Sequence, residues 1–283
     1  MNLPGRGAFL ALILGLFLGT GPSANPAQAQ SLNFAGGDSD DPIEIFADNG
    51  IEWQQENQIF LARGNARAVR GEVNVNAEVL RAYYRETKET GTDIWRLDAE
   101  GKVKITSPGE TVYGDQGVYD IDNSILVIKG NKVRFVTDDD EITANSQLEY
   151  WEKKLMAVAR GNATAVRQEK RLRADVLAAY FRRNKSGKNI IFRIEAFDNV
   201  VIVTGKDKVT SDRAVYNVES GIATLTGSVT IIRGSTRLDG CRAEVNLNTS
   251  ISKLFSCGPR EGGGKRVMGT LTSEGLRRDV KEN

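Results

Sequence analysis

The stretch Ala62–Arg70, which reads ARGNARAVR, returns 97 residues later at Ala159–Arg167 with one substitution, Thr164 for Arg67. The same offset holds without a gap for a long way along the chain. It aligns Val79–Arg85 with Val176–Arg182, Ile94–Ala99 with Ile191–Ala196, and Val118–Asp120 with Val215–Asn217. Self-similarity at a fixed spacing is typical of stacked architectures, in which each unit buries its apolar face against its neighbours. We therefore expect one elongated, repetitive body.

The segments around these repeats alternate apolar and polar residues, as half-buried strands do. Examples are Pro42–Ile45, Glu72–Asn76 and Lys102–Thr106. One such strand ends at Gly64 and Asn65, where we expect a tight turn because both residues tolerate left-handed backbone conformations. The pattern predicts an all-β fold, an elongated open β-jelly-roll or β-solenoid of stacked antiparallel strands. With strands about 4.8 Å apart, roughly eleven rungs would give a body about 50–60 Å long.

Strands with one apolar face would form two sheets that face each other across an apolar interior. This interior is either a packed core or, if the sheets do not close, a groove along the body. The candidate groove residues are Ile43, Ile45, Val73, Val75, Ile105, Tyr119, Ile121, Phe135, Ile194, Ile202, Tyr216 and Val218. Val103, Val133, Phe192 and Val200 belong to the same predicted inward row.

The first residues have the features of a secretory signal peptide: Arg6, the apolar run Ala8–Leu18 and the cleavage-like sequence Ala27-Gln28-Ala29. The run is too short for the roughly 20 residues that span a bilayer. We predict a cleaved signal over residues 1–29, a flexible linker over 30–40, the β-body over 41–258 and a flexible tail over 259–283. The mature protein would then be exported and soluble.

The composition argues against several classes of function. Without Arg6 the chain has 37 basic and 37 acidic residues, which is not the basic balance of a nucleic-acid-binding protein. It has no histidine, the commonest general base and metal ligand. We expect no catalytic residue, no metal site and no cofactor.

Cys241 and Cys257 are the chain's two cysteines, and an even count in an exported chain indicates a disulfide. Closing a loop of this length is worth about 3 kcal/mol in the chain-entropy model. The alternative is two free thiols. The acidic run Asp138–Glu141 lacks the glycine of a calcium loop, so we expect a solvated turn there.

Several segments together resemble the LptA/OstA-like family of lipopolysaccharide transport proteins. They are Asp41–Asp48 behind the signal peptide, Gly64-Asn65-Ala66, Val73–Glu78, Ala99–Val103, Ala214–Asn217 and Leu225–Val229. The likeness covers about Asp41–Phe255.

The resemblance implies a periplasmic β-jelly-roll whose interior carries the acyl chains of lipopolysaccharide (lipid A) from the inner to the outer membrane. It implies an inner-membrane-anchored partner at the N-terminal edge, where Pro42, Ile43, Glu44 and Ile45 would form the partner-facing strand. It also implies an outer-membrane β-barrel partner at the C-terminal edge and allows head-to-tail self-association. A free edge strand has the unpaired backbone groups that strand addition needs.

Two features depart from the family pattern: the doubled 97-residue unit and the cysteine pair. Either is compatible with a related bridge component, such as the periplasmic part of the outer-membrane partner. Two other classes stay open from the sequence. One is a β-helical protein that binds or processes polysaccharide, and the other is a structural envelope repeat with a filled core.

Overall fold

The computed structural model describes residues 43–87, 91–185, 187, 189–205, 207–246, 248–249, 251–258 and 266–270. The predicted signal peptide, the linker, Pro42 and most of the predicted tail lie outside these residues. Within them, no helix is long and apolar enough to cross a bilayer.

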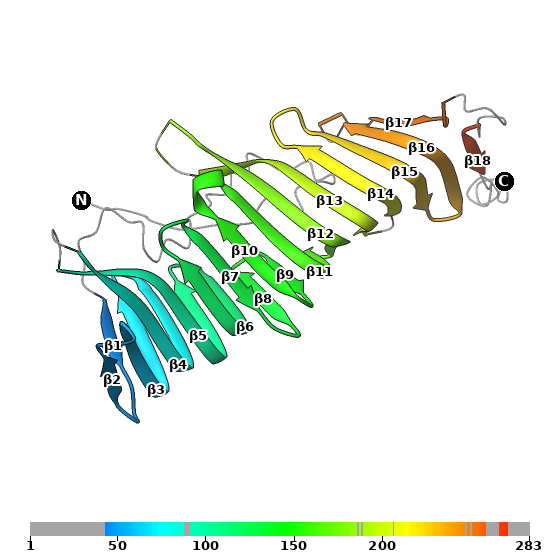
Figure 1. The fold of residues 1–283 in the computed structure, drawn as a ribbon. Helices are drawn as coiled ribbons and strands as arrows, with labels where there is room; N and C mark the ends of the chain where they lie inside the picture. The colour runs from blue at the N-terminus through cyan, green and yellow to red at the C-terminus, as the bar shows by residue number, and fades with distance from the viewer. Residues whose placement is uncertain are drawn as a thin grey trace, which may run out of the picture.

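The described chain is all-β, as predicted, and its eighteen strands form one antiparallel sheet (Figure 1). The exception is one 3₁₀ turn, η1, at Glu152–Lys154. The strands are β1 (Glu44–Phe46), β2 (Ile51–Gln54), β3 (Ile59–Arg70), β4 (Val73–Thr87), β5 (Gly91–Ser107), β6 (Glu110–Asp120), β7 (Ile125–Lys129), β8 (Val133–Thr137), β9 (Glu141–Ala144), β10 (Gln147–Trp151), β11 (Met156–Arg167), β12 (Lys170–Arg183), β13 (Asn189–Thr204), β14 (Asp207–Asn217), β15 (Ile222–Arg233), β16 (Thr236–Asn246), β17 (Ile251–Phe255) and β18 (Met268–Thr270).

The sheet is folded lengthwise into a trough with two walls (Figure 1). Strands β2, β7, β10 and β17 lie in one wall, which we call wall A. Strands β1, β8, β9 and β18 lie in the other, wall B. The ten remaining strands cross a corner from one wall to the other. β3, for example, pairs with β2 through Ile59–Ala62 and with β1 through Arg67–Val69.

Every second long strand turns the corner through a β-bulge, and the residues of the bulge have positive φ. In β3 the bulge is Gly64 (φ 78°) and Asn65 (φ 44°), and the pairing with β4 slips by one residue between Arg63 and Ala66. The repeat has the same bulge at Gly161 (φ 88°) and Asn162 (φ 49°). A bulge of this kind bends the strand while the ladder continues on both sides.

The sequence predicted a turn at Gly64-Asn65, and this prediction was wrong in kind. The left-handed conformation is present, but it occurs within the twelve residues of β3 instead of ending a strand. Each long strand therefore contributes to both walls. The strands β1/β2, β7/β8, β9/β10 and β17/β18 are single passes split at the corner, so the eighteen strands make fourteen rungs, not eleven.

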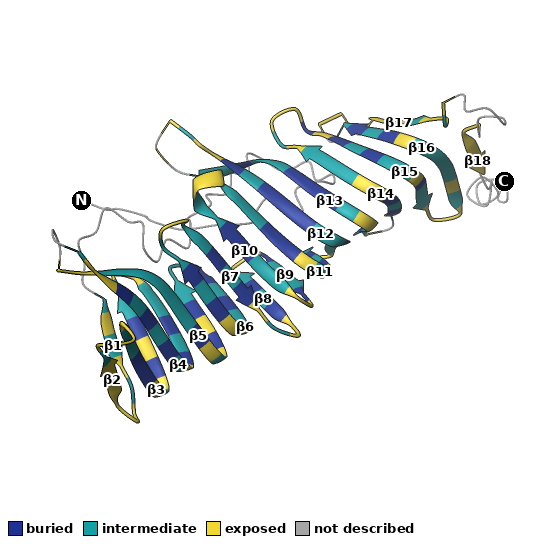
Figure 2. Ribbon diagram, viewed as in Figure 1, coloured by how far each residue is buried: buried dark blue, intermediate teal, exposed yellow. Residues whose placement is uncertain are grey.

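Small side chains fill the corner of the trough. The row nearest the corner on wall B contains no described side chain larger than valine. Its members are Ala66, Ala77, Val103, Gly114, Val133, Ala144, Ala163, Ala174, Val200, Ser211, Val229 and Gly240. All of these residues except the two glycines are buried (Figure 2). Small residues let the two walls approach closely at the corner.

The predicted disulfide is present. Cys241 of β16 is bonded to Cys257, two residues after β17, with 5.0 Å between the Cα atoms. The bond joins the last complete rung to the terminal one. It therefore fastens the C-terminal end of the trough, where, within the described residues, the split rung β17/β18 pairs with β16 alone.

We expect Gly161→Ala to lower the free energy of unfolding by about 3 kcal/mol. The added Cβ would lie 3.0 Å from the backbone nitrogen of Ser146, and the residue would keep its positive φ. Gly50→Ala is the control, because Gly50 has φ 97° but open space at its Cβ, so strain alone should cost about 1 kcal/mol. Chemical denaturation measures both. Equal losses would show that the close approach at the corner is unimportant.

Candidate functional site

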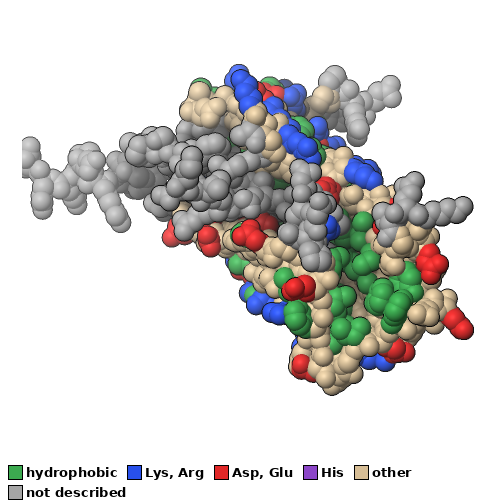
Figure 3. Space-filling model, turned by 90° about the vertical axis from the view of Figure 1, so that its left-hand side faces the viewer, with side chains coloured by type: hydrophobic (Ala, Val, Ile, Leu, Met, Phe, Trp, Pro, Cys, Tyr) green, Lys and Arg blue, Asp and Glu red, His purple; other side chains and the backbone are tan. Residues whose placement is uncertain are grey.

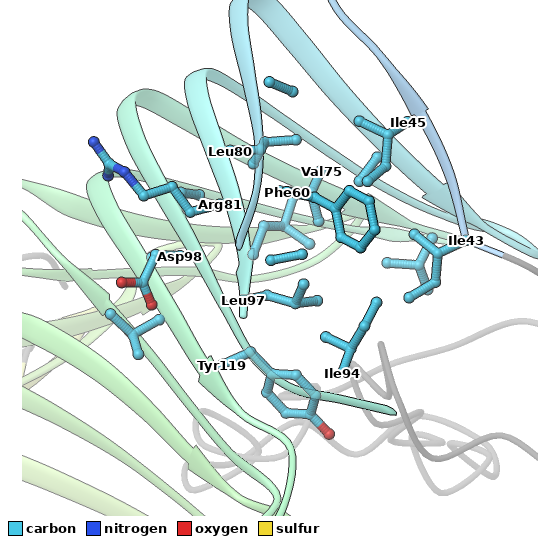
Figure 4. A pocket seen from close by; sticks show the side chains of 18 of the residues that line it. Ile43, Ile45, Phe60, Val75, Leu80, Arg81, Ile94, Leu97, Asp98 and Tyr119 are labelled. Carbon is cyan, nitrogen blue, oxygen red and sulfur yellow. The ribbon is translucent and has the colours of Figure 1, made fainter. Parts of the chain in front are cut away.

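The N-terminal half of the trough contains an apolar hollow of about 770 Å³, a volume that includes the space at its open mouth. It is lined by inward side chains of the first six rungs, from Ile43 and Ile45 to Tyr119 and Leu126 (Figure 4). Phe60, Leu80 and Leu97 form its wall-A side. Figure 4 shows these side chains converging, whereas Arg81 and Asp98 project away from them. The interior is thus not filled here.

A second hollow, of about 620 Å³, continues the first one toward the C-terminus. Leu126 lines both hollows, so one side chain of β7 is the boundary between them. Phe135 and Ile142 line the second hollow from wall B, and Tyr150 and Leu177 line it from wall A. The apolar groove therefore extends from the first rung to β12.

The two lips of the groove differ in chemistry. The outermost inward row of wall A is apolar and contains Tyr84, Ile94, Ile121, Leu155, Phe181, Ile191 and Val218. The corresponding row of wall B is largely polar and contains Arg70, Val73, Ser107, Glu110, Thr137, Asp140, Arg167, Lys170, Thr204, Asp207, Arg233 and Thr236. A molecule in the groove would meet an apolar lip on one side and a charged lip on the other.

One polar contact lies near the boundary between the hollows. The Tyr119 hydroxyl lies close to the Glu152 carboxylate of η1. Burial raises the pKa of Tyr119, and the Glu152 charge raises it further. Burial also raises the pKa of Glu152, against the opposing charge of Arg183. A carboxylate thus lies beside the hydroxyl of an otherwise apolar ring in the groove.

The structure places the predicted groove residues in three groups. Seven line the hollows: Ile43, Ile45, Val73, Val75, Ile105 and Tyr119 in the first, and Phe135 in the second. Ile194 and Ile202 are buried in the core, and Ile121, Tyr216 and Val218 pack against it half-buried. The sequence analysis did not predict further residues that line the hollows, among them Phe60, Leu80 and Tyr150. Apolar and polar residues alternate around these positions in the sequence. The sequence does not show where the corner bulges shift this alternation, so it does not show which residues share a face.

Two sequence predictions about side-chain position were wrong. Phe192 is not part of the buried core, because the pairing of β12 with β13 slips at Tyr180/Phe181 and Ile191 is buried instead. Asp140 is not in a solvated turn. It is 5% exposed, and its carboxylate accepts two hydrogen bonds from Arg167, at 2.8 and 2.7 Å.

Both end rungs leave large apolar side chains exposed. Phe46, Ile51 and Trp53 do so at the N-terminal end, where Figure 3 shows hydrophobic side chains gathered among acidic ones. Ile251, Phe255 and Met268 do so at the C-terminal end. In the described chain, β1 and β2 pair with β3 alone, and β17 and β18 with β16 alone. Each end thus has a free backbone edge beside apolar side chains.

The described residues contain no group of three or more His, Cys, Asp or Glu side chains placed to hold a metal ion. Two acidic side chains of the wall-B lip, Asp140 and Asp207, are instead engaged with arginines. Arg233, for example, donates a hydrogen bond of 2.7 Å from Nε to Asp207.

Comparison with known proteins gives three similarities. A family described as LptA/(LptD N-terminal domain) LPS transport protein matches residues 44–151 and again residues 141–251. An uncharacterized protein of Rhizobium meliloti (strain 1021) is 28% identical over 117 residues, which are 39% of this chain and 62% of that protein. The crystal structure of LptH, the LptA homologous periplasmic component of the lipopolysaccharide transport device from Pseudomonas aeruginosa, aligns with 47% of this chain and 94% of its own, with 14% identity and a TM-score of 0.39.

The two family matches meet at β9 and β10, in the middle of the trough, and together span the β-body from its first strand to its last long one. The repeat in the sequence is therefore a repeat of the family's unit. The chain belongs to the LptA/LptD N-terminal domain family of lipopolysaccharide transport proteins.

Proposed function

We propose that this protein is a non-enzymatic periplasmic bridge that holds the acyl chains of lipopolysaccharide in its groove and passes them from the inner to the outer membrane. The observation that carries the proposal is the pair of joined apolar hollows that run from the first rung to β12. A filled core would have suited a structural repeat. A polar cleft with a carboxylate pair would have suited a polysaccharide enzyme.

The energetics of burial favour acyl chains in this groove. Each methylene moved from water into an apolar site contributes about 0.8 kcal/mol. The lining changes little from rung to rung, since valine, leucine, isoleucine and alanine recur along both hollows. A series of similar sites lets a chain move along the groove without meeting one deep energy minimum.

The ends of the trough suit partners that add a strand. Backbone groups at a free edge supply hydrogen bonds, and neighbouring apolar side chains supply burial. We assign an inner-membrane-anchored partner to the β1/β2 end and an outer-membrane β-barrel partner to the β17/β18 end. A second copy of this chain could occupy the same edges head to tail.

The strand directions permit that self-association. The first rung runs from wall B to wall A, and the last rung runs from wall A to wall B, so docking β2 on β17 and β1 on β18 keeps the antiparallel order. The register that continues the inward rows places Glu52 of one copy opposite Lys253 of the next. It also places Phe46 opposite Met268, two exposed apolar side chains.

The groove assignment predicts lipid capture at Tyr119. A photo-crosslinking amino acid at Tyr119, 5% exposed inside the groove, should capture lipopolysaccharide during transport. The matched control is Tyr113 of the same strand, which projects outward and contacts Arg134 by a cation–π interaction at 4.8 Å. Gel shifts of the crosslinked protein measure the yield. Equal yields at the two tyrosines, or none at Tyr119, would contradict the proposal.

The head-to-tail register predicts a charge dependence. Lys253→Glu should weaken self-association roughly fivefold, because it places like charges opposite each other. Adding Glu52→Lys should restore the association in the double variant. Sedimentation velocity across a concentration series measures both effects. If the single variant associates as well as the unaltered protein, this register is wrong. If the unaltered protein is monomeric at every concentration, the head-to-tail association is wrong and both ends are left for other partners.

A further inference from the structure

The charged lip differs between the two copies of the repeat at equivalent positions. In the first copy, three neighbouring positions of this lip are Arg70, Val73 and Ile43, which continues the row beside Arg70 on the first rung; Ile43 and Val73 line the first hollow. At the same places, 97 residues later, the second copy has Asp140, Arg167 and Lys170. The two copies keep the arginine, but an apolar pair has become a carboxylate and an ammonium group.

Arg167 and Lys170 form a like-charged pair across a tight turn. They are direct partners in the pairing of β11 with β12, on either side of Gln168 and Glu169. Both alternate in phase with buried interior residues, Arg167 with Ala165 and Lys170 with Leu172, so both side chains face the groove. Like charges directly opposite each other destabilise a strand pair.

One carboxylate partly compensates these two cations. Asp140 accepts both of its hydrogen bonds from Arg167, whose side chain is 17% exposed. Burial raises the pKa of Asp140 to about 7, although Arg167 opposes this shift. Asp140 is thus fully engaged with Arg167 and, among the described residues, has no further hydrogen bond directed at Lys170.

Lys170 has no such compensation. Among the described residues no carboxylate forms an ion pair with it, and its other strand neighbour is Thr204. Asp207, the next residue of this row, is bonded to Arg233, and Glu169 in the turn is exposed. Burial lowers the pKa of Lys170, and the Arg167 charge lowers it further. The lip thus has excess positive charge at a partly desolvated position.

This position lies directly above apolar side chains of the groove. Leu172 is the next inward residue below Lys170 on β12, and Ile142 is the next one below Asp140. Successive inward residues on a strand are about 7 Å apart. An anionic group at the lip would therefore leave its attached hydrocarbon beside Leu172 and Ile142, the latter in the second hollow.

We propose that Arg167 and Lys170 form an anion subsite that binds the phosphate group of an amphiphile whose hydrocarbon chain lies in the second hollow. The inference rests on the proposed function, because it assumes that the groove holds acyl chains. Guanidinium and ammonium groups bind phosphate oxygens through charge-assisted hydrogen bonds, which are about twice as strong as neutral ones. The bound anion would also relieve the repulsion between the two cations. The first copy has Val73 in place of the lysine and lacks the subsite, so it would hold acyl chains without binding the headgroup.

The test compares two amphiphiles that differ only in a phosphate, 1-lauroyl lysophosphatidic acid and 1-lauroyl glycerol. Each is titrated against the mature full-length protein below its aggregation concentration, with tryptophan fluorescence or calorimetry as the readout. Lys170→Val installs the residue of the first copy, and Lys170→Gln removes the charge while keeping polarity. Lys208→Gln is the matched control, because Lys208 is an exposed lysine on the outward face of the same wall.

We expect both Lys170 variants to bind the phosphate amphiphile about tenfold more weakly and the neutral amphiphile as before. Lys208→Gln should change neither affinity. Equal weakening of both amphiphiles would mean that Lys170 only supports the wall, and no change would mean that it does not contact the headgroup; either result overturns the subsite.

Two further measurements distinguish a failure of the subsite from a failure of the groove, and headgroup binding from binding of free phosphate. If the unaltered protein fails to bind 1-lauroyl glycerol, the groove function fails, whereas selective loss of the phosphate preference in the variants concerns the subsite alone. Inorganic phosphate at millimolar concentration should not displace the phosphate amphiphile. Displacement would assign the site to free phosphate and overturn its role as a headgroup site.

Discussion

The bend that every long strand makes at the corner is the constraint on which the rest of the structure depends. A strand must continue its hydrogen-bonded ladder in both walls and still change direction, and a bulge with positive φ achieves both. Gly161 and Asn162 supply it in β11, as Gly64 and Asn65 do in β3. The close approach of neighbouring backbone, such as Ser146 beside Gly161, leaves no room for a larger residue. The repeated Gly-Asn pair therefore meets two geometric requirements, the positive φ of the bulge and the close approach of neighbouring backbone.

The corner also determines where the interior is filled and where it is hollow. Residues no larger than valine occupy the wall-B row at the corner, so the walls meet there with little space between them. Farther out the walls diverge, and larger side chains such as Phe60, Tyr119 and Phe135 line the space without filling it. A groove thus follows from the same bend that makes two walls out of one sheet. The disulfide fastens this arrangement at its last rung.

The fold could be predicted from the sequence because two periodicities, alternation along strands and the 97-residue repeat, are both explicit in it. What could not be predicted follows from the bulges. One extra residue shifts the inward phase, so Phe192 was assigned inward where Ile191 is buried. The sequence predicts a turn at Gly64 because residues that tolerate positive φ occur both in turns and in bulges, and the sequence does not distinguish the two. Asp140 was read as solvated because nothing local shows that Arg167, on a strand formed 27 residues later, covers it.

Duplication of the family's unit adds a property that a single unit lacks. Two copies in one chain share β9 and β10, so the groove continues through the middle of the body without an interface between subunits. Because the copies are covalently joined, residues inside the trough can differ between them while the two end rungs stay as they are. The divergence is seen at the lip, where Val73 corresponds to Lys170 and Ile43 to Asp140. The two halves of the trough therefore differ in the chemistry of their lip at equivalent positions, which makes the body asymmetric along its length in a way that a uniform repeat would not be.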